Sequence, residues 1–161
     1  MAKTTSNPFT QSIKTPGIII PSGVTVDVIA NTTGVVTAGV LGTSGPQLVA
    51  TAGTNDSVLK SLIVTSNDSA EKHLHIWLDR AGTTPLTLLA TISIPATAGA
   101  NTGGTVASVD ILGSVYFPGL PTDQTGKPTL PMAAGSKLYV GLVAALTNNK
   151  VLYVTAVLED Y

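Results

Sequence analysis

The chain is poor in charged residues, which make up only 11% of its 161 residues. A typical soluble domain carries about 25%. Aromatic residues are also scarce, at 4%, and the formal net charge is −1. A surface with so little charge protects a monomer only weakly against self-association. The composition therefore predicts that much of the surface packs against copies of the chain or against a larger assembly.

Cysteine is absent, which excludes disulfide frameworks, thiolate metal sites and a cysteine nucleophile. Long apolar runs are absent too. The longest, Leu138 to Leu146, covers nine residues, whereas a membrane-spanning helix needs about 20. Residues 1–14 lack the apolar core of a secretory signal. We therefore expect no membrane partner and no export signal.

Basic residues do not cluster, and this argues against binding to nucleic acid. The eight lysine and arginine residues stand singly along the chain. Binding to DNA or RNA depends on grouped contacts to phosphates that release counterions. We expect no nucleic-acid partner.

Short runs rich in valine, isoleucine and leucine alternate with turns, and no window shows helical periodicity. This pattern predicts an all-β fold, an antiparallel β-sandwich that is jelly-roll-like. The strands are expected at Gly17–Ile20, Val24–Ile29, Thr33–Leu41, Gln47–Thr51, Val58–Thr65, Lys72–Asp79, Leu86–Ile94, Val106–Phe117, Lys137–Leu146 and Val151–Leu158.

Two features complete the predicted organisation. Residues 1–16 are polar, contain two prolines and lack periodicity, so they are expected to form an extended N-terminal arm before one domain over residues 17–161. Asn148-Asn149 suits a tight turn because asparagine tolerates positive φ. We therefore predict a hairpin that joins the last two strands.

The clearest alternation, Lys72 to Asp79, places His73, His75 and Trp77 on one face of a strand. Two histidines at this spacing allow a shared metal ion, and the acids Glu71 and Asp79 have the same parity. A catalytic zinc site usually takes three protein ligands. A polar or subunit-contact face ending in an aromatic residue is the preferred interpretation. No metal and no cofactor are expected.

Sequence motifs for catalysis are missing. Gly-x-Ser-x-Gly does not occur, and Gly126-Lys127 lacks the spacing and the following hydroxyl residue of a phosphate-binding loop. Loop aspartates are expected to form turns instead of calcium sites. The chain is therefore predicted not to be an enzyme. The aromatic residues available to a carbohydrate-binding platform are Trp77, Tyr116, Phe117, Tyr139 and Tyr153.

From about Ser57 to Tyr161 the chain resembles small structural proteins of tailed bacteriophage virions. The similarity is one of style and order of elements. The segments that carry it are Ser61–Asp68, Leu74–Leu78, Ile111–Tyr116, Leu130-Pro131, Gly135–Val140 and Val151–Tyr161. The resemblance implies a capsid decoration (cement) protein or a related head protein. Such proteins are β-rich, often trimeric, and bound on the shell at subunit junctions.

The resemblance and the composition together give a functional expectation. The chain is expected to be a structural virion protein that is made in the host cytoplasm, forms a homotrimer, and binds the major capsid protein or other virion proteins at the capsid surface. Pro8, Phe9, His73, His75 and Trp77 are the expected interface residues. Deletion of residues 1–16 is expected to weaken attachment and leave the fold intact. The alternative is a receptor- or glycan-binding β-sandwich on a virion or cell surface.

Overall fold

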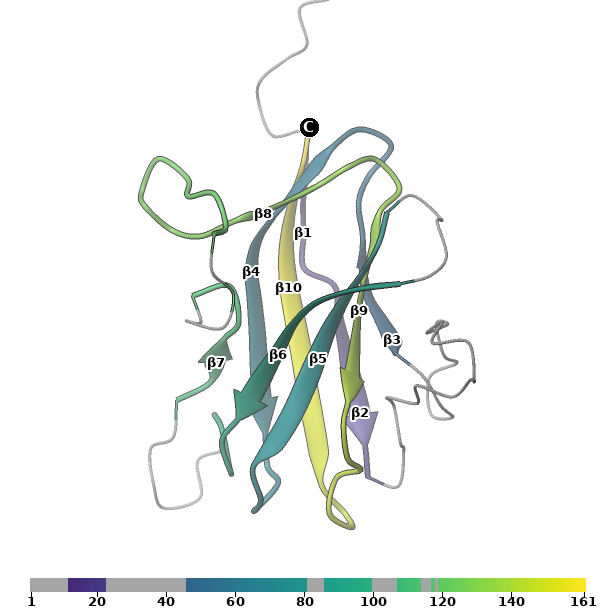
Figure 1. The fold of residues 1–161 in the computed structure, drawn as a ribbon, viewed down its shortest axis with the longest axis vertical. Coiled ribbons are helices and arrows are strands. Elements are labelled where there is room, and N and C mark those ends of the chain that lie inside the picture. The colour runs from purple at the N-terminus through teal and green to yellow at the C-terminus, as the bar shows by residue number, and fades with distance from the viewer. Residues whose placement is uncertain (1–11, 23–45, 81–85, 100–106, 114–116, 118) are drawn as a thin grey trace, which may run out of the picture.

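The computed structural model describes residues 12–22, 46–80, 86–99, 107–113, 117 and 119–161. Within these ranges the chain forms two antiparallel sheets that pack face to face as a sandwich (Figure 1). The all-β, antiparallel sandwich prediction is confirmed. The predicted strands at Val24–Ile29 and Thr33–Leu41 lie outside the described residues, as do Pro8 and Phe9.

The larger sheet has six strands in the order β1-β10-β4-β7, with β2 also paired to β10 and β8 also paired to β4. Its strands are β1 (Ser12–Lys14), β2 (Gly17–Pro21), β4 (Ser57–Ser66), β7 (Val109–Asp110), β8 (Leu130–Met132) and β10 (Val151–Asp160). The long pairing of β10 with β4 forms its centre.

The smaller sheet has four strands in the order β3-β9-β5-β6. Its strands are β3 (Gln47–Thr51), β5 (Lys72–Asp79), β6 (Thr87–Ile94) and β9 (Lys137–Leu142). Strands β5 and β6 are consecutive and pair antiparallel, with an irregular register near Ile76 and Trp77.

The core lies between the two sheets and follows from the alternation of apolar residues. On β10, the even-numbered residues from Leu152 to Leu158 are fully buried, and the residues between them are partly or largely exposed. On β5, Leu74, Ile76 and Leu78 are buried in the core. β-Branched and leucine side chains on these inward faces bury apolar surface, which is the main stabilising contribution.

The predicted hairpin between the last two strands is wrong. A turn does occur there: Asn149 has φ of 61°, and the Lys150 N–H donates to the Thr147 carbonyl at 3.1 Å. However, β9 belongs to the four-stranded sheet and β10 to the six-stranded sheet. The turn therefore connects the two layers instead of pairing neighbouring strands.

Two further boundaries differ from the expectation. Of the strand expected over Val106–Phe117, only Val109–Asp110 is a strand among the described residues. The chain turns at Ile111–Gly113, where Ile111 and Leu112 are both buried. Ser12–Lys14, the end of the expected arm, pairs with β10. The Pro16 carbonyl also accepts a hydrogen bond from the Ala156 N–H at 2.8 Å.

Candidate functional site

The histidines and the tryptophan of β5 share one face, as the alternation predicted, and this face points away from the main core. His73 is exposed, but Trp77 is only 5% exposed. Trp77 packs with Leu86 and Tyr139 in a small cluster separate from the main core, and its ring meets His75 edge-on at 5.7 Å between centroids. The Trp77 side chain therefore contributes mainly to packing within the chain.

The metal alternative for this strand finds no support in the geometry. His73 Nε2 lies 3.7 Å from Glu71 Oε1, and Glu71 also accepts a hydrogen bond from Ser93 Oγ at 2.7 Å. Over the part of the chain that the structure describes, no three histidine or acidic side chains converge as metal ligands do. This arrangement is an exposed polar strand end.

Asp68 joins loops that lie far apart in the sequence. Its fully buried carboxylate accepts hydrogen bonds from the Thr147 N–H at 2.7 Å, the Thr147 hydroxyl at 2.8 Å and the Ala70 N–H at 2.9 Å. Lys72 Nζ lies 3.5 Å away. Burial alone would raise the pKa of Asp68, but these hydrogen bonds and the lysine lower it to about 2.

Asp123 organises the loop that precedes β8. Its carboxylate accepts hydrogen bonds from the Thr125 hydroxyl at 2.7 Å, the Thr125 N–H at 2.8 Å and the Lys127 N–H at 3.1 Å. Lys60 of β4 forms an ion pair with it at 2.9 Å. The Thr125 hydroxyl, followed by Lys60, lowers the pKa of Asp123. Asp68 and Asp123 thus have the turn-forming role expected of loop aspartates.

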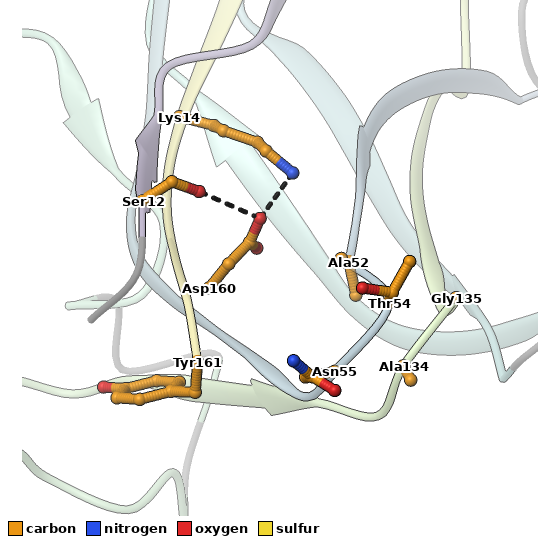
Figure 2. A pocket seen from close by; sticks show the side chains of 10 residues that line it. Ser12, Lys14, Ala52, Thr54, Asn55, Ala134, Gly135, Asp160 and Tyr161 are labelled. Atoms are coloured by element: carbon orange, nitrogen blue, oxygen red, sulfur yellow. Dashed lines mark hydrogen bonds and ion pairs between the residues drawn. The ribbon is translucent and has the colours of Figure 1, made fainter. Parts of the chain in front are cut away.

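A hollow of about 610 Å³ lies where β1 and the end of β10 meet two turns (Figure 2). Asp160 extends into it and interacts with Lys14 and Ser12. A buried hydrogen bond of 2.6 Å from Ser57 Oγ fixes the same carboxylate. Lys14 and then Ser57 lower the pKa of Asp160. With its carboxylate oxygens already bonded within the chain, Asp160 has a structural role here.

The outward face of the six-stranded sheet carries exposed apolar side chains. Ile19, Ile63 and Tyr153 are 52%, 38% and 44% exposed. Tyr153 is opposite Ile19 on β2 and Thr65 on β4, while Ile63 is opposite Thr155. We call these five residues the Tyr153 patch. Cross-strand neighbours of this kind form one continuous surface.

A shallow hollow of about 380 Å³ borders the Tyr153 patch between β2 and β10. Gly17 lines this hollow. Here β2 lies so close to β10 that an added Cβ at position 17 would lie 2.9 Å from the Val154 carbonyl oxygen. Charges at the border of the patch include Lys60 and Glu159, which lie 3.9 Å apart, and the exposed Asp110, which is opposite Ile63. An apolar patch with charges at its border is suited to contact with another protein.

The interface residues expected on β5, His73, His75 and Trp77, lie on the four-stranded sheet, whereas the Tyr153 patch lies on the six-stranded sheet. The alternation in Val151–Leu158 was visible, and the outward position of Tyr153 follows once the even-numbered residues are assigned to the core. Ile19 and Ile63 come from distant segments, and only the pairing of β2 and β4 with β10 brings them beside Tyr153.

Among the described residues, no helix has the length and apolar character needed to cross a membrane. Comparisons with protein-family models, with curated proteins and with solved structures found no match to this chain.

Proposed function

We propose that the chain is a structural protein of a tailed bacteriophage virion, most specifically a capsid decoration protein that docks on the head shell through the Tyr153 patch. The observation that carries the proposal is this patch: apolar and hydroxyl side chains spread over three adjacent strands of a sandwich with few charges. The resemblance of residues 57–161 to small virion proteins gives its direction.

The physical logic concerns the cost of desolvation. A charge buried at an interface loses its hydration and must find a partner, whereas apolar side chains gain from burial and a threonine hydroxyl needs only a hydrogen-bond partner. Many identical copies on a shell also allow each contact to be weak, because attachment in an ordered array gains from avidity. Major capsid protein is the proposed partner, and the jelly-roll arrangement and the virion location are parts of the same proposal.

The glycan-binding alternative gains no specific observation. Of the aromatic residues available to a sugar platform, Trp77, Phe117 and Tyr139 are 5%, 9% and 6% exposed, and Tyr116 lies outside the described residues. Among the residues that the structure describes, Tyr153 is the one large aromatic side chain that is exposed. A stacking platform usually needs exposed rings, so docking on protein is the better proposal.

The first test is whether the chain is part of a particle. Virions purified from the organism that encodes the chain are examined with gold-labelled antibodies raised against the recombinant protein. Regular labelling of heads supports the proposal. Particles that lack the chain contradict it, and labelling confined to tail tips favours the receptor-binding alternative.

The second test concerns the docking face. Tyr153→Ser is added to particles that lack the chain, and its occupancy is compared with that of Leu48→Ser. Leu48 is a matched control because it is 43% exposed on the other sheet. Aromatic anchors at the centre of an interface often contribute ~2 kcal/mol or more, so we expect at least tenfold weaker binding for Tyr153→Ser alone. Equal binding of the two variants would exclude the patch.

A further inference from the structure

Strand β6 forms one edge of the four-stranded sheet. Among the described residues, β5 alone pairs with it, and its other side faces away from the sheet. An edge strand presents unpaired N–H and C=O groups that can accept another strand. Natural proteins therefore protect such edges with charges, proline, bulges or very short strands.

The other described edges carry such protection. On the six-stranded sheet, β2 ends in Pro21, β8 contains Pro131, and β7 has only two residues, one of them Asp110. On the four-stranded sheet, β3 is interrupted by a register shift between Leu48 and Ala50. Each of these features disfavours the addition of a further strand.

Strand β6 has a comparable register shift, at Leu89, but it has no proline and no charge. Thr87–Ile94 is eight residues long and contains no charge, no proline and no glycine. Its irregular register lies between Leu88 and Ala90, which leaves Ala90–Ile94 in regular antiparallel pairing with β5. The regular, uncharged stretch Ala90–Ile94 is the part of this edge that is a template for strand addition.

We propose that β6 pairs antiparallel with β6 of a second copy and so joins two four-stranded sheets into one of eight strands. Ala90, Ile92 and Ile94 point into the core, while Thr91 and Ser93 lie on the outward side. In a continuous sheet, inward residues must be opposite inward residues. The two-fold axis between the strands therefore lies level with a residue and not between two residues. If the pairing is centred on the strand, that residue is Thr91 or Ile92.

Charge at the two ends of β6 favours a second copy as the partner. Glu71 lies exposed at the Ser93 end, where it binds Ser93 Oγ. Arg80 lies exposed at the Thr87 end, directly after β5. Antiparallel pairing brings Glu71 of each copy to the end that carries Arg80 of the other. A net charge of −1 adds little repulsion between copies.

Cross-linking tests the geometry, because the chain has no cysteine of its own. With the axis at Thr91 or Ile92, the two Thr91 Cα atoms are roughly 5–8 Å apart. We expect Thr91→Cys to give a covalent dimer with a short bis-maleimide. Thr87→Cys is the matched control on the same strand, since its two copies would be at least eight residues apart, roughly 27 Å at ~3.4 Å per residue.

The solution mass tests the pairing independently. Light scattering over a concentration series should approach twice the chain mass of 16.3 kDa. Thr91→Lys places two like charges beside the axis and should leave a monomer, whereas Thr155→Lys, an equivalent change in the middle of the other sheet, should still dimerise. Unchanged emission from the single tryptophan, Trp77, checks that each variant is folded.

Three results would overturn the pairing: a monomer at every concentration, a trimer as the resemblance implies, or equal cross-linking of Thr91→Cys and Thr87→Cys. These measurements use the purified chain without particles. A chain that dimerises through β6 but is absent from virions would support the pairing and contradict the proposed function. A chain that is found on heads, but is monomeric in solution and gives no cross-linked dimer, would contradict the pairing and support the proposed function.

Discussion

Replacement of Asp68 by asparagine tests the reasoning about the buried loop junction. Asparagine keeps the size of the side chain but removes the charge and replaces one acceptor oxygen with a donor. The pKa of Asp68, lowered from an ordinary 3.8 to about 2, corresponds to ~2 kcal/mol of preferential stabilisation of the ionised form in the folded state. The Thr147 N–H, which donates to Asp68 Oδ2 at 2.7 Å, loses its acceptor when the amide nitrogen takes the place of that oxygen.

We therefore expect Asp68→Asn to lower the free energy of unfolding by ~2–3 kcal/mol at pH 7. The measurement is urea denaturation followed by the emission of Trp77 and by far-ultraviolet circular dichroism. Asp110→Asn is the control, because Asp110 is exposed and a surface change of this kind usually stays within ~0.5 kcal/mol.

The pH dependence makes the test sharper. A carboxylate whose pKa is lowered by folding stabilises the protein above its unfolded pKa, and that stabilisation is lost as the pH falls through the folded value. The difference between wild type and Asp68→Asn should therefore be full above about pH 5 and shrink towards pH 2. A difference below ~0.5 kcal/mol at pH 7, or one independent of pH, would refute the role of the charge.

Two further predictions follow from the same structure. Gly53→Ala should destabilise the fold by ~1–3 kcal/mol, because its Cβ would lie 2.9 Å from the Asp160 carboxyl group; thermal unfolding should show little change for Gly113→Ala, whose Cβ meets nothing closer than 3.5 Å. Acid titration of the wild type should show stability falling below about pH 4, since the pKa values of Asp68, Asp123 and Asp160 are all lowered in the folded state. Stability that is constant down to pH 2 would contradict these assignments.

Strand β5 shows what the sequence can predict. Its bounds, Lys72–Asp79, and its two faces follow from the alternation alone, because one face meets the core and the other does not. The fold class follows for the same reason. In contrast, the turn at Asn148-Asn149 was located correctly but its consequence was not. The residues of a turn predict that the chain reverses direction there. They do not specify which sheet the next strand joins.

The candidate surfaces show where sequence reasoning ends. The alternation placed His73, His75 and Trp77 together on one face of their strand, but the burial of Trp77 depends on Tyr139, which is 62 positions away in the chain. The junction at Asp68 likewise depends on Thr147 across a separation of 79 residues. Such contacts follow from the pairing of strands, which single-sequence periodicity does not specify.

The expected effect of truncating the N-terminal segment also changes. Because Ser12–Lys14 pairs with β10 and Lys14 interacts with Asp160, a deletion of residues 1–16 would remove part of the sheet. A deletion that spares this pairing has to end before Ser12.

The antiparallel pairing of Ser12 with Asp160 has a mechanical consequence. Both residues lie at the same end of the strand pair, so a load applied between them would separate β1 from β10 one hydrogen bond at a time. This peeling geometry resists force poorly, because the bonds break in sequence and do not share the load. Tension is resisted better when it pulls β4 and β10 in opposite directions along their length, because the hydrogen bonds of that long pairing then share the load. The end of the sheet where Ser12 meets Asp160 is therefore its weaker point under tension.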